Sequence, residues 1–146
     1  MRAVSPDASK FPIYLHDAFD LDRFTNFVAS RSDFVVQDHH SYFVFSPYDQ
    51  TEPASQHTID VKGAIAESFL RASNRVRRNM IIGEWSCALT PQSLADEGDA
   101  GQVQKDFCEQ QMKVYANTTA GWTFWGLCFL WYFVSLQTIA DAFCSI

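Results

Sequence analysis

Short apolar runs alternate along this chain with segments whose apolar residues recur at helical spacing. The runs begin near residues 11, 33, 79 and 121, and the helical segments lie at 21–28, 59–76 and 102–116. Two polar stretches, 46–57 and 91–101, are expected to be loops. Because strands that alternate with helices pair in parallel through right-handed crossovers, the pattern predicts an α/β fold of order β-α-β-α-β-α-β.

Two architectures fit this order of elements. Four strands within 146 residues suit a small doubly wound domain. They suit equally well one half of a (β/α)8 barrel, which takes roughly 250 residues when complete. In both architectures the ligand meets the C-terminal ends of the strands, so the search for a site starts there.

Composition excludes several classes of protein. The chain is 47% hydrophobic and 19% charged, which indicates a folded domain rather than a disordered one. It has 17 acidic and 11 basic residues, so no nucleic-acid partner is expected. The four cysteines form no CxxC pair, and we expect no structural zinc. A disulfide between Cys87 and Cys108 is left open, as is the use of Asn117, which begins an N-x-T glycosylation sequence.

The two ends of the chain stand apart in composition. Residues 1–10 form a lead-in without the apolar core of a signal peptide. Residues 114–140 carry no charge. This segment is long enough to span a membrane, but it lacks the flanking positive charge that is typical of membrane spans. The alternative, which we favour, is a buried strand followed by an apolar tail.

Polar and aromatic residues follow the apolar runs at the predicted strand ends. Glu84 comes directly after a run of apolar residues and is a candidate nucleophile or general acid/base, although a surface glutamate fits the same pattern. His40 and Tyr42 are two residues apart, so on an extended segment both point to one side and can reach one carboxylate or sugar hydroxyl. A structural hydrogen-bonded pair is the alternative. His39 and His40 point to opposite sides, so they are not expected to share a metal with Asp38.

Three aromatic residues near these strand ends are candidates for sugar contacts. The indole face of Trp125 can stack on a pyranose ring, and Phe45 and Phe19 can line the entrance to a sugar site. Plain core packing explains each of them equally well.

Four segments together resemble one known family. They are PIYLHDAF at 12–19, FVVQDHHSYFVF at 34–45, GEWSCALT at 83–90 and GWTFW at 121–125. This set resembles the fungal exo-β-1,3-glucanases, or glucan 1,3-β-glucosidases, of glycoside hydrolase family 5. The similarity covers roughly residues 11–125.

The resemblance implies a fold and a role for each candidate residue. Residues 11–126 would form strands five to eight of a TIM barrel, and 127–146 would be an atypical apolar tail. Glu84 would be the nucleophile, with His40 and Tyr42 supporting it. Trp125 would be the platform beneath the sugar, and Phe45 would stand at the pocket entrance.

The resemblance also implies an activity and a location. The family hydrolyses β-1,3-glucan with retention, releases glucose, needs no metal or organic cofactor, and acts outside the cell or in the cell wall. The family's acid/base glutamate follows an asparagine, and this sequence contains no Asn-Glu dipeptide. We therefore expect the chain to be inactive without the other half of the barrel. Two alternatives remain: a carbohydrate-binding remnant without catalysis, and a protein tethered to a membrane through residues 122–140.

Overall fold

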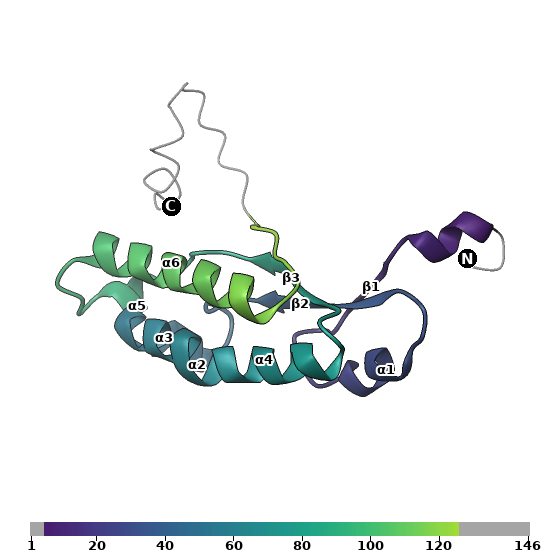
Figure 1. The fold of residues 1–146 in the computed structure, drawn as a ribbon. Coiled ribbons are helices and arrows are strands. Elements are labelled where there is room, and N and C mark those ends of the chain that lie inside the picture. Colours follow the sequence, from purple (N-terminus) through teal and green to yellow (C-terminus); the bar gives the residue numbers. More distant parts are fainter. Residues whose placement is uncertain (1–4, 126–146) are drawn as a thin grey trace, which may run out of the picture.

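The computed structural model describes residues 5–125 and shows a mixed α/β fold, as the alternating pattern predicts (Figure 1). Its elements in chain order are a 3-10 helix Pro6–Lys10, β1 Ile13–His16, α1 Thr25–Ser30, β2 Val35–Ser41, α2 Pro47–Thr51, α3 Ala54–Asp60, a π-helical turn Val61–Ile65, α4 Ala66–Arg75, β3 Met80–Trp85, α5 Pro91–Leu94 and α6 Ala100–Thr118.

The three strands form one parallel sheet in the order β1-β2-β3. The predicted fourth strand at 121–125 is present only as an isolated parallel bridge between Trp122 and Ile82. Backbone bonds still hold this segment beside β3: Ile82 N donates to Gly121 O at 3.1 Å, and Trp125 N donates to Trp85 O at 2.8 Å. Residues 121–125 therefore do not form the predicted fourth strand, although this segment lies beside β3 and is hydrogen-bonded to it.

Strand β2 is longer than its apolar residues suggest. The apolar run ends at Val36, yet the strand continues to Ser41. Its polar residues alternate in burial: Gln37, His39 and Ser41 are buried, and Asp38 and His40 are only partly so. The first set faces the helices, since the His39 ring packs on Phe69 of α4. The second set lies on the opposite face of the sheet.

Both predicted loops contain helical residues. The helix expected at 59–76 begins at Ala54, and α2 precedes it. A capping box starts α2, because Ser46 Oγ accepts a bond from Asp49 N at 3.0 Å and the Asp49 carboxylate accepts one from Ser46 N at 3.1 Å. Thr90 caps α5 within the second stretch. Helices α2 and α5 thus both begin at polar cap residues, Ser46 and Thr90, and a search for apolar periodicity does not detect such residues.

The first predicted helix also starts later than expected. Its apolar spacing pointed to 21–28, but α1 spans Thr25–Ser30. Residues before it form turns, and Leu21 O is used by side chains instead of by a helix: Gln37 Nε2 donates to it at 2.7 Å and Thr25 Oγ1 at 2.8 Å. The third prediction, 102–116, is confirmed as α6, which Asp99 caps through Gln102 N.

Helices α3, α4 and α6 pack together against the sheet and enclose the core (Figure 1). The largest side chains of this core with almost no exposure are Trp85, Tyr115 and Phe107. The ring of Trp85 meets that of Tyr115 edge to face at 5.3 Å, so β3 is fastened to α6. This packing fixes the strand whose C-terminal end carries Glu84.

Within residues 5–125, no helix combines the length and hydropathy that a membrane crossing needs. The tail at 127–146 lies outside the described residues, as does most of the 122–140 segment on which the membrane alternative depends.

Candidate active site

The structure brings Glu84, His40 and Tyr42 together at the C-terminal ends of β2 and β3. The Tyr42 hydroxyl donates to Glu84 Oε2 at 3.1 Å. His40 Nδ1 lies 3.2 Å from the same oxygen. Both contacts therefore fall on one oxygen of the carboxylate. The sequence prediction that His40 and Tyr42 reach one carboxylate fits this geometry.

An irregularity in the sheet brings Glu84 opposite His40. Ile82 pairs with His39, but the next pair joins Glu84 to His40, so Gly83 is an extra residue in β3. Regular pairing would set Gly83 opposite His40 and turn Glu84 to the other face, because strand side chains alternate. A one-residue bulge thus determines on which side the carboxylate lies. The sequence signal for it is a glycine inside an apolar strand run.

The surroundings of Tyr42 keep its phenol protonated. Burial disfavours the charged phenolate, and the bond to the Glu84 carboxylate and its negative charge add to this effect, raising the pKa of Tyr42 to about 12. The hydroxyl consequently remains a hydrogen-bond donor to Glu84 at any physiological pH. The hydroxyl thus keeps its contact with Oε2 of Glu84 as a donor.

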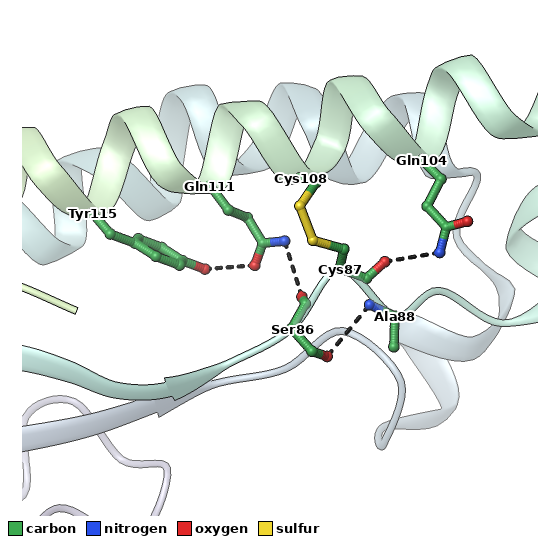
Figure 2. Close-up of a disulfide and its surroundings, with 7 residues drawn as sticks. All are labelled: Ser86, Cys87, Ala88, Gln104, Cys108, Gln111 and Tyr115. Atoms are coloured by element: carbon green, nitrogen blue, oxygen red, sulfur yellow. Dashed lines mark hydrogen bonds between the residues drawn. A yellow bond between two sulfur atoms is a disulfide. The ribbon is translucent and has the colours of Figure 1, made fainter. Parts of the chain in front are cut away.

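Helix α6 and a disulfide anchor the segment that follows Glu84 (Figure 2). Cys87 and Cys108 are joined, which answers the pairing that the sequence left open. Gln111 Nε2 donates to Ser86 O at 3.1 Å, and Gln104 Nε2 donates to Cys87 O at 3.0 Å. One face of a long helix therefore fixes the backbone two and three residues beyond the carboxylate.

A hydrogen bond within α6 supports this anchor. The Tyr115 hydroxyl donates to Gln111 Oε1 at 2.8 Å and lies 2.9 Å from Ser41 Oγ on β2. Burial raises the pKa of Tyr115, against a smaller opposing effect of the Ser41 bond, so the phenol stays neutral. The tyrosine connects α6 to β2 through Ser41 and to β3 through the ring of Trp85.

A buried polar network beneath the site was not predicted from the sequence. Asp17, which is fully buried just after β1, accepts bonds from His39 Nδ1 at 2.8 Å and Gln37 Nε2 at 3.1 Å. Burial alone would raise the pKa of Asp17, but the bonds and charge of His39, with smaller contributions from Gln37 and His16, lower it overall. The available signal was the alternating polar pattern of residues 37–41, which marks a strand with one polar buried face.

The two adjacent histidines have different partners, as strand alternation predicts. His39 bonds Asp17, whereas His40 contacts Glu84. In the part of the chain that the structure describes, no group of three metal-ligating side chains is close enough to hold an ion.

The predicted aromatic residues lie around the site in two different ways. The Phe45 ring contacts Tyr42 at 5.4 Å, and the Phe19 ring lies 5.9 Å from His40. Both are mostly exposed, at 69% and 60%. Trp125 is 62% exposed, and its backbone N donates to the carbonyl oxygen of Trp85, the residue after Glu84.

A cavity of about 520 Å³ adjoins His40 and Tyr42. Its wall also includes Phe19, Phe45 and Phe69, so it is lined largely by aromatic rings. Glu84 is not among its lining residues, and the cavity therefore lies beside the carboxylate rather than around it. Exposed rings next to polar groups form a surface suited to a ligand with both apolar faces and hydroxyls.

Fold and site together define a class: a parallel α/β protein with a carboxylate near a strand end, contacted by a histidine and a tyrosine. Sequence comparison then gives the relatives. The chain is 33% identical over 133 residues to glucan 1,3-beta-glucosidase 3 of Schizosaccharomyces pombe. The aligned region covers 88% of this chain and 27% of that protein. It is 37% identical over 81 residues to glucan 1,3-beta-glucosidase of Yarrowia lipolytica, covering 53% of this chain and 18% of that protein.

The chain is thus a relative of the fungal glucan 1,3-beta-glucosidases, which confirms the resemblance. It spans about a quarter of the Schizosaccharomyces pombe protein, with 27% of that protein aligned. No protein-family model matches the sequence.

Proposed function

We propose that this chain carries the nucleophile side of a retaining glucosidase that releases glucose from β-1,3-glucan. The observation that carries the proposal is the double contact on one oxygen of Glu84, from the Tyr42 hydroxyl at 3.1 Å and from His40 Nδ1 at 3.2 Å. The names of the relatives support β-1,3-glucan as the substrate.

The geometry suits nucleophilic attack by the other carboxylate oxygen. Because both contacts fall on Oε2, that oxygen is held and Oε1 is the one able to attack an anomeric carbon. Attack forms a glycosyl ester on Glu84 and breaks the bond to the leaving oxygen, and water then hydrolyses the ester with net retention. Tyr42 and His40 stabilise the carboxylate before attack and again when the ester is cleaved.

The second carboxyl group of the reaction is proposed to lie outside this sequence. A retaining glycosidase needs a general acid about 5–5.5 Å from the nucleophile to protonate the leaving oxygen. The family resemblance assigns that role to a glutamate after an asparagine, and the 146 residues contain no such pair. Loss of a general acid typically costs about 10²- to 10⁴-fold in rate, so the chain alone is expected to leave natural glucan intact.

The proposed architecture follows from the same assignment. Residues 11–126 would be strands five to eight of a glycoside hydrolase family 5 barrel, after a lead-in at 1–10 and before the tail at 127–146. Support comes from the parallel strand order and from the position of Glu84, His40 and Tyr42 at strand C-termini. The disulfide suits an extracellular or cell-wall location, since such bonds persist in oxidising compartments.

Three aromatic residues are proposed to bind the sugar. Trp125 would be the platform beneath the ring, and Phe45 and Phe19 would flank the entrance to the cavity beside His40. Their exposure of 60% or more leaves their faces open to a pyranose. No cofactor or metal is part of the proposal.

An aryl β-glucoside with an activated leaving group tests this function, because such a leaving group needs little acid assistance. We expect slow release of the phenol by the chain, with β-glucose as the first product by NMR. Glu84→Gln should abolish the release, whereas Glu67→Gln, on an exposed face of α4, should not. Release that persists in Glu84→Gln, or α-glucose as the first product, would refute the assignment.

Binding without catalysis is a second candidate, favoured by the exposed aromatic residues and the missing Asn-Glu pair. Titration with laminarin-type oligosaccharides, followed by tryptophan fluorescence, separates the two. Binding that Trp125→Ala removes, together with no phenol release from the activated glucoside, would establish a carbohydrate-binding protein.

A further inference from the structure

We propose that Asp38 is a positioning residue that holds the imidazole of His40 against Glu84. Asp38 lies two residues before His40 on β2, so both side chains are on one face of the sheet. The inference deepens the function proposed for Glu84 and rests on it. It adds a residue to which neither the sequence pattern nor the family resemblance gave a role.

The first observation is a buried carboxylate oxygen without a hydrogen-bond donor. Asp38 Oδ1 is inaccessible to solvent and has no hydrogen-bond partner among the described residues. The polar atom that faces it is His40 Nε2, at 3.6 Å. A buried carboxylate oxygen is costly unless a charge or donor compensates it, so the pairing with His40 is the contact that makes its burial tolerable.

The second observation is that His40 stands between two carboxylates. Nε2 faces Asp38, and Nδ1 faces Glu84 Oε2 at 3.2 Å. Both ring nitrogens thus face a carboxylate oxygen, one from each strand. The Asp38 carboxylate on the Nε2 side therefore fixes the direction of the ring, so that Nδ1 is directed to Glu84.

The third observation explains why residue 83 is glycine. A Cβ built on Gly83 would lie 1.9 Å from Asp38 Oδ1 and 2.7 Å from its Cγ, so any side chain there would displace the carboxylate. The backbone of Gly83 is itself fixed, because the Thr123 hydroxyl donates to Gly83 O and Thr123 N donates to Ile82 O at 3.0 Å. The bulge residue thus provides the space that Asp38 occupies.

Besides the Phe19 ring at 5.9 Å, a histidine of β1 lies beside the imidazole. The His16 ring lies 4.0 Å from the His40 ring, centroid to centroid, at a tilt of 41°. It limits rotation of the His40 ring on that side but gives it no acceptor. The direction of the two ring nitrogens is therefore set by Asp38 and Glu84.

Nitrogen-15 NMR of the histidine rings in the full 146-residue chain tests the proposal without any need for catalysis. His40→Gln identifies the signals of His40. In Asp38→Asn we expect the Nε2 signal of His40 to shift, because the carboxylate that faces this nitrogen in the wild-type chain is gone.

Controls separate this effect from a general change of charge. Asp22→Asn removes an exposed carboxylate and should leave the His40 signals unchanged. Gly83→Ala, which displaces the Asp38 carboxylate, should reproduce the shift seen in Asp38→Asn. Identical His40 signals in the wild type and in either folded variant, Asp38→Asn or Gly83→Ala, would overturn the proposal.

A kinetic readout distinguishes the failure of this inference from failure of the proposed function. With the activated glucoside, Asp38→Asn should lower kcat by about 10²-fold and change KM little, as expected when a catalytic group is misplaced. If wild type releases no phenol, the proposed function fails while the NMR comparison still decides the role of Asp38. Equal kcat values in wild type and Asp38→Asn would refute the positioning role alone.

Discussion

At the scale of single residues, the candidate site was partly readable from the sequence. Glu84, His40 and Tyr42 could be singled out because they follow predicted strands and because residues two apart share one face of a strand. The structure adds positions for Asp38 and Gly83 from which we infer roles that the sequence analysis did not assign to them. Their roles depend on a one-residue bulge, and pattern analysis assumes regular pairing.

The ionisation of Tyr42 gives a direct check on its contact with Glu84. In the wild-type chain, NMR of the Tyr42 ring carbon that bears the hydroxyl should give a pKa of about 12, against roughly 10 for a free tyrosine. Glu84→Gln removes the carboxylate charge but not the burial, so the pKa should fall part of the way toward the free value. Glu67→Gln is the matched control, and an equal pKa in all three proteins would mean that Tyr42 does not contact Glu84.

Asp17 should make stability depend on acid pH. Its pKa is lower in the folded chain than in the unfolded one, so its contribution is fully present above the unfolded pKa of about 3.9 and is lost as the pH falls through the folded value. Asp17→Asn should lower the free energy of unfolding by about 1–3 kcal/mol at neutral pH, because it disrupts a buried hydrogen-bonded pair.

Urea unfolding at neutral pH and at a pH below the folded pKa measures this contribution. The difference between wild type and Asp17→Asn should narrow in acid. The exposed Asp22→Asn should change stability little at either pH. A difference that is constant across this range would contradict the assigned role of Asp17.

At the scale of elements, apolar periodicity predicted α6 and the position of all three strands. It failed where buried residues are polar. Strand β2 continues through Gln37, His39 and Ser41 because their side chains find partners in Asp17 and Tyr115. Such partners come from distant parts of the chain, so no local pattern could reveal them.

The disulfide should stabilise the arrangement of β3 and α6. It joins Cys87 to Cys108 across 21 residues, and closing a loop of that size is worth about 3 kcal/mol. Cys87→Ser combined with Cys108→Ser should lower the free energy of unfolding by roughly that amount, measured by urea unfolding. Added reductant should lower the stability of the wild type but not that of the double variant. Equal unfolding midpoints for wild type and double variant would exclude a stabilising role.

At the scale of the whole molecule, β1 lies at an edge of the sheet. Among residues 5–125, β1 pairs on one side only, with β2, and its residues Ile13 and Tyr14 are 41% and 54% exposed. Phe11 and Phe34 lie next to this edge and are 67% and 45% exposed. In the proposed barrel this edge would pair with a preceding strand, and the apolar side chains around it would be covered.

Uncovered, this edge should make the chain self-associate, because an apolar edge strand offers unpaired backbone groups to a second copy. Tyr14→Lys places a charge on the edge and should reduce the associated fraction in sedimentation velocity. Leu70→Lys changes an exposed apolar residue on α4 and serves as the control. A monomeric wild-type chain at micromolar concentration would contradict this account of the edge.

The central claim is that Glu84 attacks the anomeric carbon of a β-glucoside as a nucleophile. Covalent trapping of the glycosyl ester tests this claim most directly. A 2-deoxy-2-fluoro-β-glucoside with an activated leaving group should form a stable glycosyl ester. The fluorine slows both the formation and the hydrolysis of the ester, whereas the activated leaving group speeds its formation alone, so the ester accumulates. Mass spectrometry of tryptic peptides should find the added sugar on Glu84, and Glu84→Gln should remain unlabelled. A label on any other residue, or a wild-type chain that stays unlabelled, would contradict the account.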